Sequence, residues 1–192
     1  MRWTSVLTYG SAVALLVAIA SQLLGWPAAR SWFLLIWAVL LLPVVIGLFR
    51  HPMRWPAWGV FVGFWGGVGV VFLIVVQILA LWDVLRGPAY GGWSAWPLAL
   101  VGLWILVASS LGFGGEGFPR VVDGLGILTG IGLLAISTGT WAGGADVARV
   151  AAVVTVPAYC LWAFGLGFVF WRLAAGNRGR EAISGTRAAA LP

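Results

Sequence analysis

Five acidic side chains, one histidine and one cysteine are the groups in this 192-residue sequence that could carry acid–base, metal or nucleophilic chemistry. Each acid has an arginine three or four residues away along the chain. The pairs are Asp83 with Arg86, Asp123 with Arg120, Asp146 with Arg149, Glu181 with Arg178 and Glu116 with Arg120. Because residues at these spacings lie side by side on a helix, the sequence predicts local ion pairs and leaves no acid for a proton relay or a cation site.

Four side chains are candidates for contacts with a cavity or a solute. Asp123 lies two residues inside an apolar segment. We expect it to pair with Arg120 at the level of the lipid headgroups, and the alternative is a gate or a substrate contact. Gln77 lies deep in another apolar segment, where its amide must hydrogen-bond across helices or line a cavity. Trp65 and Trp104 also lie well inside their segments, so each indole N–H needs a partner on another helix.

Motifs of known enzymes and metal sites are missing from the chain. His51 and Cys160 stand alone, so neither a histidine metal cluster nor a cysteine pair can be built. The sequence contains no H-E-x-x-H, G-x-S-x-G, C-x-x-C or phosphate-binding G-x-x-x-x-G-K. We therefore predict no catalytic residues, no metal ligands and no cofactor, and we expect that the protein is not an enzyme. An intramembrane enzyme is the weakest alternative, because it would need a buried acid, base or metal ligand.

The elements that position these groups are six long apolar stretches, at about residues 4–24, 32–49, 58–82, 96–113, 121–142 and 150–171. Each has the roughly 17–25 residues that a helix needs to cross the hydrocarbon core of a bilayer. Backbone N–H and C=O groups there must be paired within the segment, which requires helices. We predict an all-α, polytopic membrane protein, in which residues 1–172 form a single bundle of six transmembrane helices with short loops.

Two segments outside these stretches stand out. The longest loop, Asp83–Ala95, carries the turn signals Gly87-Pro88 and Gly91-Gly92. After Arg172 the composition changes to arginine, alanine, glycine and serine. This composition predicts a short, basic, disordered cytoplasmic tail over residues 173–192, which can lie on anionic lipid.

The basic residues orient the chain in its membrane. All eleven are arginines, and if the N-terminus is cytoplasmic, eight lie on the inner side and three on the outer side. The inner ones are Arg2, Arg50, Arg54, Arg120, Arg172, Arg178, Arg180 and Arg187, and the outer ones are Arg30, Arg86 and Arg149. The positive-inside rule therefore predicts cytoplasmic N- and C-termini. We expect a bacterial cytoplasmic (inner) membrane, contact with membrane lipids and no binding of nucleic acid.

Glycines recur at helical spacing in two of the apolar stretches. Gly59, Gly63 and Gly67 follow one another at intervals of four residues, and Gly126 and Gly130 do the same further along the chain. Small residues let the backbones of membrane helices approach closely. We expect these glycines to form a helix-packing face, either within the bundle or against another membrane protein or a second copy of the chain.

Two functional interpretations follow. The first is a small, non-enzymatic bacterial membrane protein that acts through helix packing with a membrane partner. The alternative is a small-solute permease or the membrane substrate-capture subunit of a transporter, with Tyr90 and Trp93 in a loop that covers the solute. This alternative rests on a resemblance in shape to the substrate-binding components of bacterial vitamin importers. The features that carry the resemblance are the size of the chain, its six helices, its inward termini and the small pair Ala14 and Ala18.

Overall fold

The computed structural model describes the backbone of residues 2–49, 56–112 and 119–188, and it describes no side chain beyond residue 175. Six helices account for nearly all of these residues, and no strand occurs in these ranges. The helices are α1 (Arg2–Leu23), α2 (Pro27–Phe49), α3 (Pro56–Leu81), α4 (Gly87–Gly112), α5 (Arg120–Trp141) and α6 (Ala145–Ala188). All six are long and apolar enough to span a membrane, so the predicted all-α fold with six transmembrane helices is confirmed.

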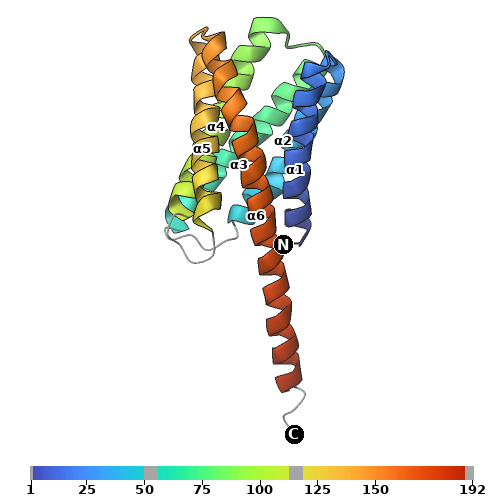
Figure 1. Ribbon diagram of the computed structural model, residues 1–192, viewed down its shortest axis with the longest axis vertical. Coiled ribbons are helices and arrows are strands. Elements are labelled where there is room, and N and C mark those ends of the chain that lie inside the picture. Colours follow the sequence, from blue (N-terminus) through green and yellow to red (C-terminus); the bar gives the residue numbers. More distant parts are fainter. Residues whose placement is uncertain (1, 50–55, 113–118, 189–192) are drawn as a thin grey trace.

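The helices form a closed ring in chain order. Each helix contacts the next one along the chain, and α6 also contacts α1. Figure 1 shows this arrangement, with both termini at the same end of the bundle and α6 projecting beyond it. Short connections enforce the antiparallel order. Gly25 and Gly143, in the connections after α1 and α5, have φ values of 71°, a backbone conformation that glycine adopts without strain after a helix end.

Helices α4 and α6 exceed their predicted ranges by the largest margins. α4 begins at Gly87, so most of the segment Asp83–Ala95 is helical and the connection from α3 is short. The reason is that Pro88 occupies the second position of α4, where its missing N–H would be unpaired anyway. α6 continues to Ala188, through residues for which a disordered tail was predicted. Extension of an existing helix needs no new nucleus, which favours this continuation.

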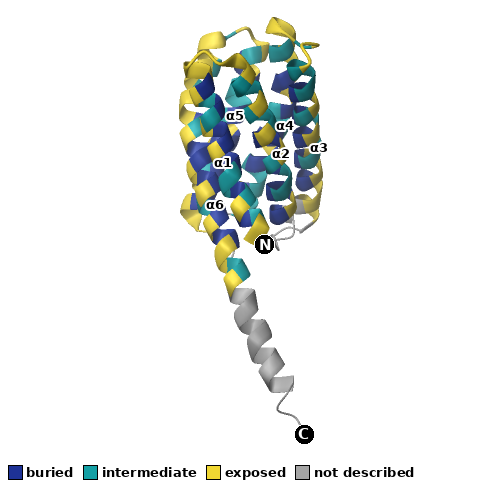
Figure 2. Cartoon of the chain, turned by 90° about the vertical axis from the view of Figure 1, so that its right-hand side faces the viewer, coloured by how far each residue is buried: buried dark blue, intermediate teal, exposed yellow. Residues whose placement is uncertain are grey.

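Figure 2 shows buried residues in dark blue and exposed residues in yellow along the same helices, and apolar side chains occur in both groups. Leu41, Val70, Ile105 and Leu166 are at most 1% exposed. The outer surface carries large apolar side chains such as Phe64, which is 63% exposed. Lipid is as apolar as leucine, so such a surface suits a membrane, and packing inside the ring depends on close fit.

Tryptophans mark the two ends of the bundle, as expected of the aromatic belts at a membrane interface. Those near an end of the bundle are 43–79% exposed: Trp3, Trp26, Trp32, Trp58, Trp82, Trp93, Trp96, Trp141 and Trp171. These positions define the level at which lipid headgroups meet the protein.

Candidate functional site

Helices α4 and α5 pack closely, and the two predicted glycines of α5 lie in their contact. A Cβ atom on Gly130 would lie 2.6 Å from Cβ of Leu106 and 2.7 Å from the carbonyl oxygen of Gly102. A Cβ atom on Gly126 would overlap the hydroxyl of Ser109 and would lie 2.7 Å from Nε1 of Trp162. Gly126 and Gly130 therefore pack inside the bundle, where they are not available to a partner.

The glycines of α3 are arranged differently from the expectation. The close contact with α4 is made by Gly66 and Gly69, which the spacing of four residues did not indicate. A Cβ atom on Gly69 would lie 2.8 Å from Cβ of Leu100. Gly63 is buried, whereas no atom lies within 4 Å of a Cβ on Gly67. The surroundings of Gly59 lie outside the part of the chain that the structure describes.

The four candidate cavity residues are not brought together. Trp104 is 2% exposed, and its indole lies against the backbone of Gly66. Trp65 is 41% exposed and faces outward, against Phe61 and Phe64. Gln77 and Asp123 lie near opposite ends of the bundle, so the four side chains do not share one site.

Gln77 belongs instead to a polar cluster at the end of the bundle opposite the termini, which we call the outer cluster. It consists of Gln22 of α1, Arg30 of α2, Gln77 of α3 and Tyr90 of α4. Nε2 of Gln77 donates to Oη of Tyr90 at 3.0 Å, and the guanidinium of Arg30 lies 5.9 Å from the centre of the Tyr90 ring. Nη1 of Arg30 donates to Oε1 of Gln22 at 2.7 Å. Trp93 does not cover this cluster, because its ring packs on Phe72 and is 54% exposed.

Asp123 lies at the other end of the bundle, and its predicted ion pair with Arg120 is wrong. Asp123 is 4% exposed, Arg120 is exposed, and no salt bridge joins the two. Instead, Oδ1 of Asp123 faces Gly112 of α4, where a Cβ atom would be only 2.9 Å away. Oδ2 is buried and has no hydrogen-bond partner among the described residues. The positive end of the α5 dipole partly offsets the charge, since Asp123 lies in its first turn.

We expect Asp123→Asn to raise the free energy of unfolding by about 1 kcal/mol, because it removes a buried charge that lacks a partner. Chemical unfolding of the purified chain in lipid nanodiscs measures this change. Asp146→Asn is the matched control, since Asp146 is also in the first turn of its helix but is exposed. A loss of stability in Asp123→Asn alone would show that the carboxylate has a cationic partner.

Of the other four predicted ion pairs, two are confirmed and two lie outside the described residues. Arg86 lies 2.8 Å from Asp83 and Arg149 lies 3.5 Å from Asp146, so both pairs are confirmed. The pairs that involve Glu116 and Glu181 lie outside the described residues. Because both confirmed pairs are exposed, each contributes little to stability.

A polar seam between α1 and α6 was missed by the sequence analysis. Oγ of Ser5 donates to the carbonyl oxygen of Gly167 at 2.6 Å, and Oγ of Ser11 lies 2.8 Å from Oη of Tyr159. Both pairs are buried. The signal was the recurrence of Ser5, Thr8 and Ser11 at intervals of three residues, which places them on one helix face. These bonds close the ring between the first and last helices.

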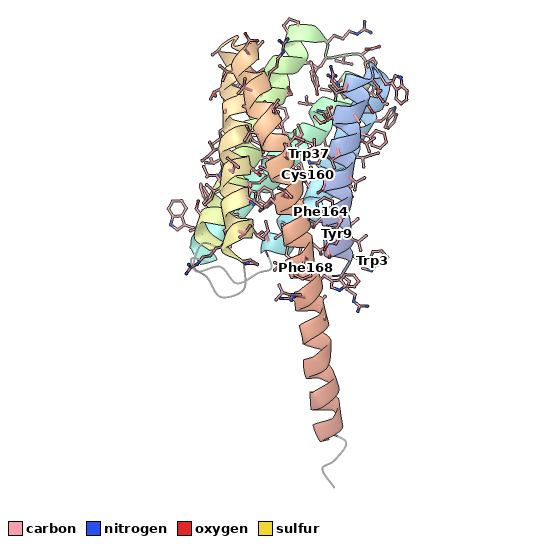
Figure 3. The ribbon with its side chains drawn as sticks, viewed as in Figure 1. Trp3, Tyr9, Trp37, Cys160, Phe164 and Phe168 are labelled. Atoms are coloured by element: carbon pink, nitrogen blue, oxygen red, sulfur yellow. The ribbon has the colours of Figure 1, made fainter. Side chains whose placement is uncertain are left out.

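Aromatic rings continue this seam along the bundle. Figure 3 shows Cys160, Phe164 and Phe168 in descending order along α6, with Tyr9 beside them on α1. The rings of Tyr9 and Phe164 are 5.7 Å apart. Cys160 is buried, and its thiol faces the carbonyl oxygen of Ala12 at 3.9 Å. Its place in this packed seam agrees with a structural side chain.

A groove opens on the outside of the bundle between α2 and α3, near the end that carries the outer cluster. It has a volume of about 620 Å³ and is mostly apolar. Its walls are Pro27, Ala28, Ser31, Trp32, Leu35, Ile78, Ala80, Leu81, Trp82 and Asp83. None of the four candidate cavity residues lines it.

Metal-binding groups do not gather in the part of the chain that the structure describes: no three histidine, cysteine or acidic side chains meet there. Comparison with known proteins adds no assignment, because no family model, curated protein or solved structure matches this chain. The function must therefore be inferred from the geometry of the bundle alone.

Proposed function

We propose that this chain is a small bacterial inner-membrane protein that is not an enzyme and acts by packing against a transmembrane helix of a partner membrane protein. The observation that supports the partner is an outward aromatic surface on α3, which we call the α3 aromatic face. It consists of Trp58, Phe61, Phe64 and Trp65, which are 41–63% exposed.

The rings of the α3 aromatic face hold one another in place. Ring centres are 6.2 Å apart between Trp58 and Phe61, 6.3 Å between Phe61 and Trp65, and 5.7 Å between Phe64 and Trp65. All three pairs are edge to face, the geometry that aromatic quadrupoles favour. A rigid aromatic surface loses little conformational entropy when it binds, and aromatic residues dominate the energetics of protein interfaces.

Trp65 distinguishes this surface from an ordinary aromatic belt at a membrane interface. It lies nine residues after the start of α3, which corresponds to about 14 Å along the helix axis. At that depth the indole N–H meets hydrocarbon, and it makes no hydrogen bond to another described residue. An unpaired donor in hydrocarbon is unfavourable. A partner helix that offers a carbonyl or hydroxyl oxygen removes this penalty.

Photocrosslinking in the native membrane tests the proposal. A photoreactive phenylalanine analogue at Phe64 should give a protein–protein adduct, whereas the same analogue at Phe168 of α6 should give lipid adducts only. Phe168 is a matched control, because it is also an outward phenylalanine and is 50% exposed. Equal adducts from both positions, or lipid adducts alone from Phe64, would contradict the proposal.

Trp65→Leu should reduce the Phe64 adduct by about tenfold, because it removes both the donor and a central aromatic ring. Trp82→Leu should leave the adduct unchanged, since Trp82 is 74% exposed at a helix end and belongs to the belt. The adduct yield on a denaturing gel measures both effects. An unchanged yield in Trp65→Leu would exclude Trp65 from the contact.

The orientation proposed for the chain has both termini in the cytoplasm. The distribution of arginines along the sequence, with eight on the inner side of the predicted topology and three on the outer side, supports it through the positive-inside rule. A second function, capture of a small solute, is supported by a different observation: the hydrogen bond between Gln77 and Tyr90 in the outer cluster. A bound small molecule on the purified chain would favour that function over partner packing.

A further inference from the structure

The outer cluster holds a positive charge that no described acid balances. Arg30 is partly buried, and it makes no salt bridge. Among the described acids, Asp83 pairs with Arg86, Asp146 pairs with Arg149, and Asp123 lies at the opposite end of the bundle. A partly buried guanidinium without a counter-ion favours the binding of an anion.

The hydrogen bonds of Arg30 leave one edge of the guanidinium free. Nη1 is used by Gln22, and this contact is exposed at the outer end. Nε has no acceptor among the described residues and is covered by protein atoms. Nη1 keeps a second N–H and Nη2 makes no hydrogen bond to a described residue, so the edge formed by Nη1 and Nη2 can bind two oxygens of a phosphate in parallel.

Two helix ends add to the positive potential at this place. α2 begins at Pro27, three residues before Arg30, and α4 begins at Gly87, three residues before Tyr90. The N-terminus of a helix carries partial positive charge and free N–H groups, so both helices favour an anion at the outer cluster. The exposed Trp26, Trp32 and Trp82 mark this end as the level of the lipid headgroups.

We propose that the outer cluster binds a phosphate group, with the guanidinium of Arg30 as the main contact. Tyr90 supports the guanidinium through its ring, and Gln77 fixes the Tyr90 hydroxyl. A phospholipid headgroup and free inorganic phosphate offer the same oxygens to this site. The proposal does not depend on the α3 aromatic face, so either can fail without the other.

Binding to the full chain in a neutral detergent tests the site with three probes: short-chain phosphatidylglycerol, inorganic phosphate, and a diacylglycerol with the same acyl chains. The affinity for the phosphate-bearing probe should fall about tenfold in Arg30→Gln, the loss expected for a charge-assisted hydrogen bond. Arg86→Gln is the matched control, because Arg86 lies at the same end of the bundle but is already paired with Asp83. Thermal unfolding of both variants checks that they fold.

Arg30→Lys provides a second variant, because it keeps the charge but loses the planar edge, and it should also weaken binding. Phosphatidylglycerol binding that equimolar inorganic phosphate does not displace would assign the site to a lipid headgroup. Binding of inorganic phosphate alone would assign it to a soluble anion. Equal affinities in Arg30→Gln and Arg86→Gln, diacylglycerol binding as tight as phosphatidylglycerol, or no binding of either phosphate probe would overturn the proposal.

Discussion

Replacing Gly130 with alanine should lower the free energy of unfolding by about 3 kcal/mol, although it adds a single methyl group. The new Cβ atom would lie 2.7 Å from the carbonyl oxygen of Gly102 and 2.7 Å from the backbone nitrogen of Leu106. Backbone atoms of α4 cannot move aside as the end of a side chain can. The methyl group must therefore separate α4 from α5 along their whole contact.

Gly124→Ala is the control for this substitution. Gly124 lies on the same helix, and nothing lies within 4 Å of a Cβ atom placed there. Alanine at this position should leave stability unchanged or slightly higher, since alanine favours helix more than glycine by about 1 kcal/mol. Unfolding in mixed micelles, followed by tryptophan fluorescence, compares the two. Equal effects of the two substitutions would contradict the close contact of α4 and α5.

The second large effect is expected at Trp104. Trp104→Ala should lower the free energy of unfolding by about 3 kcal/mol, because it leaves a cavity between α3 and α4. Since lipid is apolar, the loss comes from the missing packing contacts and not from exposure to water. Trp82→Ala should have a much smaller effect, because this tryptophan is 74% exposed.

A double-mutant cycle with Gly66 identifies the contact itself. Gly66→Ala alone should be destabilising, because the new Cβ atom would lie 2.6 Å from Cδ1 of Trp104. In the Trp104→Ala background the same substitution meets no indole and should be nearly neutral. The coupling free energy should therefore reach about 1–2 kcal/mol. Additive effects of Gly66→Ala and Trp104→Ala would show that the two residues do not touch.

The number and approximate position of the helices could be predicted because each helix is a separate apolar run that is long enough to cross a bilayer. The ion pairs of Asp83 and Asp146 could be predicted for a similar reason, since each arginine lies three residues after its acid, in the connection between α3 and α4 and at the start of α6. These features depend only on residues close together in the sequence.

Asp123 shows that the spacing of an acid and an arginine along the chain is not sufficient to predict an ion pair. It lies three residues after Arg120, so the two side chains are about 60° apart around the helix axis. Only one of the two side chains lies on the surface of α5 that packs against α4. Asp123 faces Gly112 of α4, and Arg120 is exposed. The sequence could not reveal this division, because it does not show where a neighbouring helix lies.

The close packing of Gly66 and Gly69 in α3 and the seam between α1 and α6 could not be predicted for the same reason. Glycines spaced by four residues drift by about 40° per step around a helix, so Gly63 is buried while Gly67 faces open space. Which flank of α3 meets α4 depends on the order of helices in the ring. The contact of Ser11 with Tyr159 depends on ring closure between α1 and α6, which joins residues that are distant in the sequence.

Native mass spectrometry of the chain, extracted together with its surrounding lipid, tests most directly the claim that it acts by packing against a partner helix. We expect a second membrane protein of defined mass to accompany the wild-type chain and to be absent from the Trp65→Leu variant, whose folding is checked by thermal unfolding. A partner that remains bound to Trp65→Leu would place the contact elsewhere. A monomer that carries a small molecule and no protein would contradict the claim and favour solute capture.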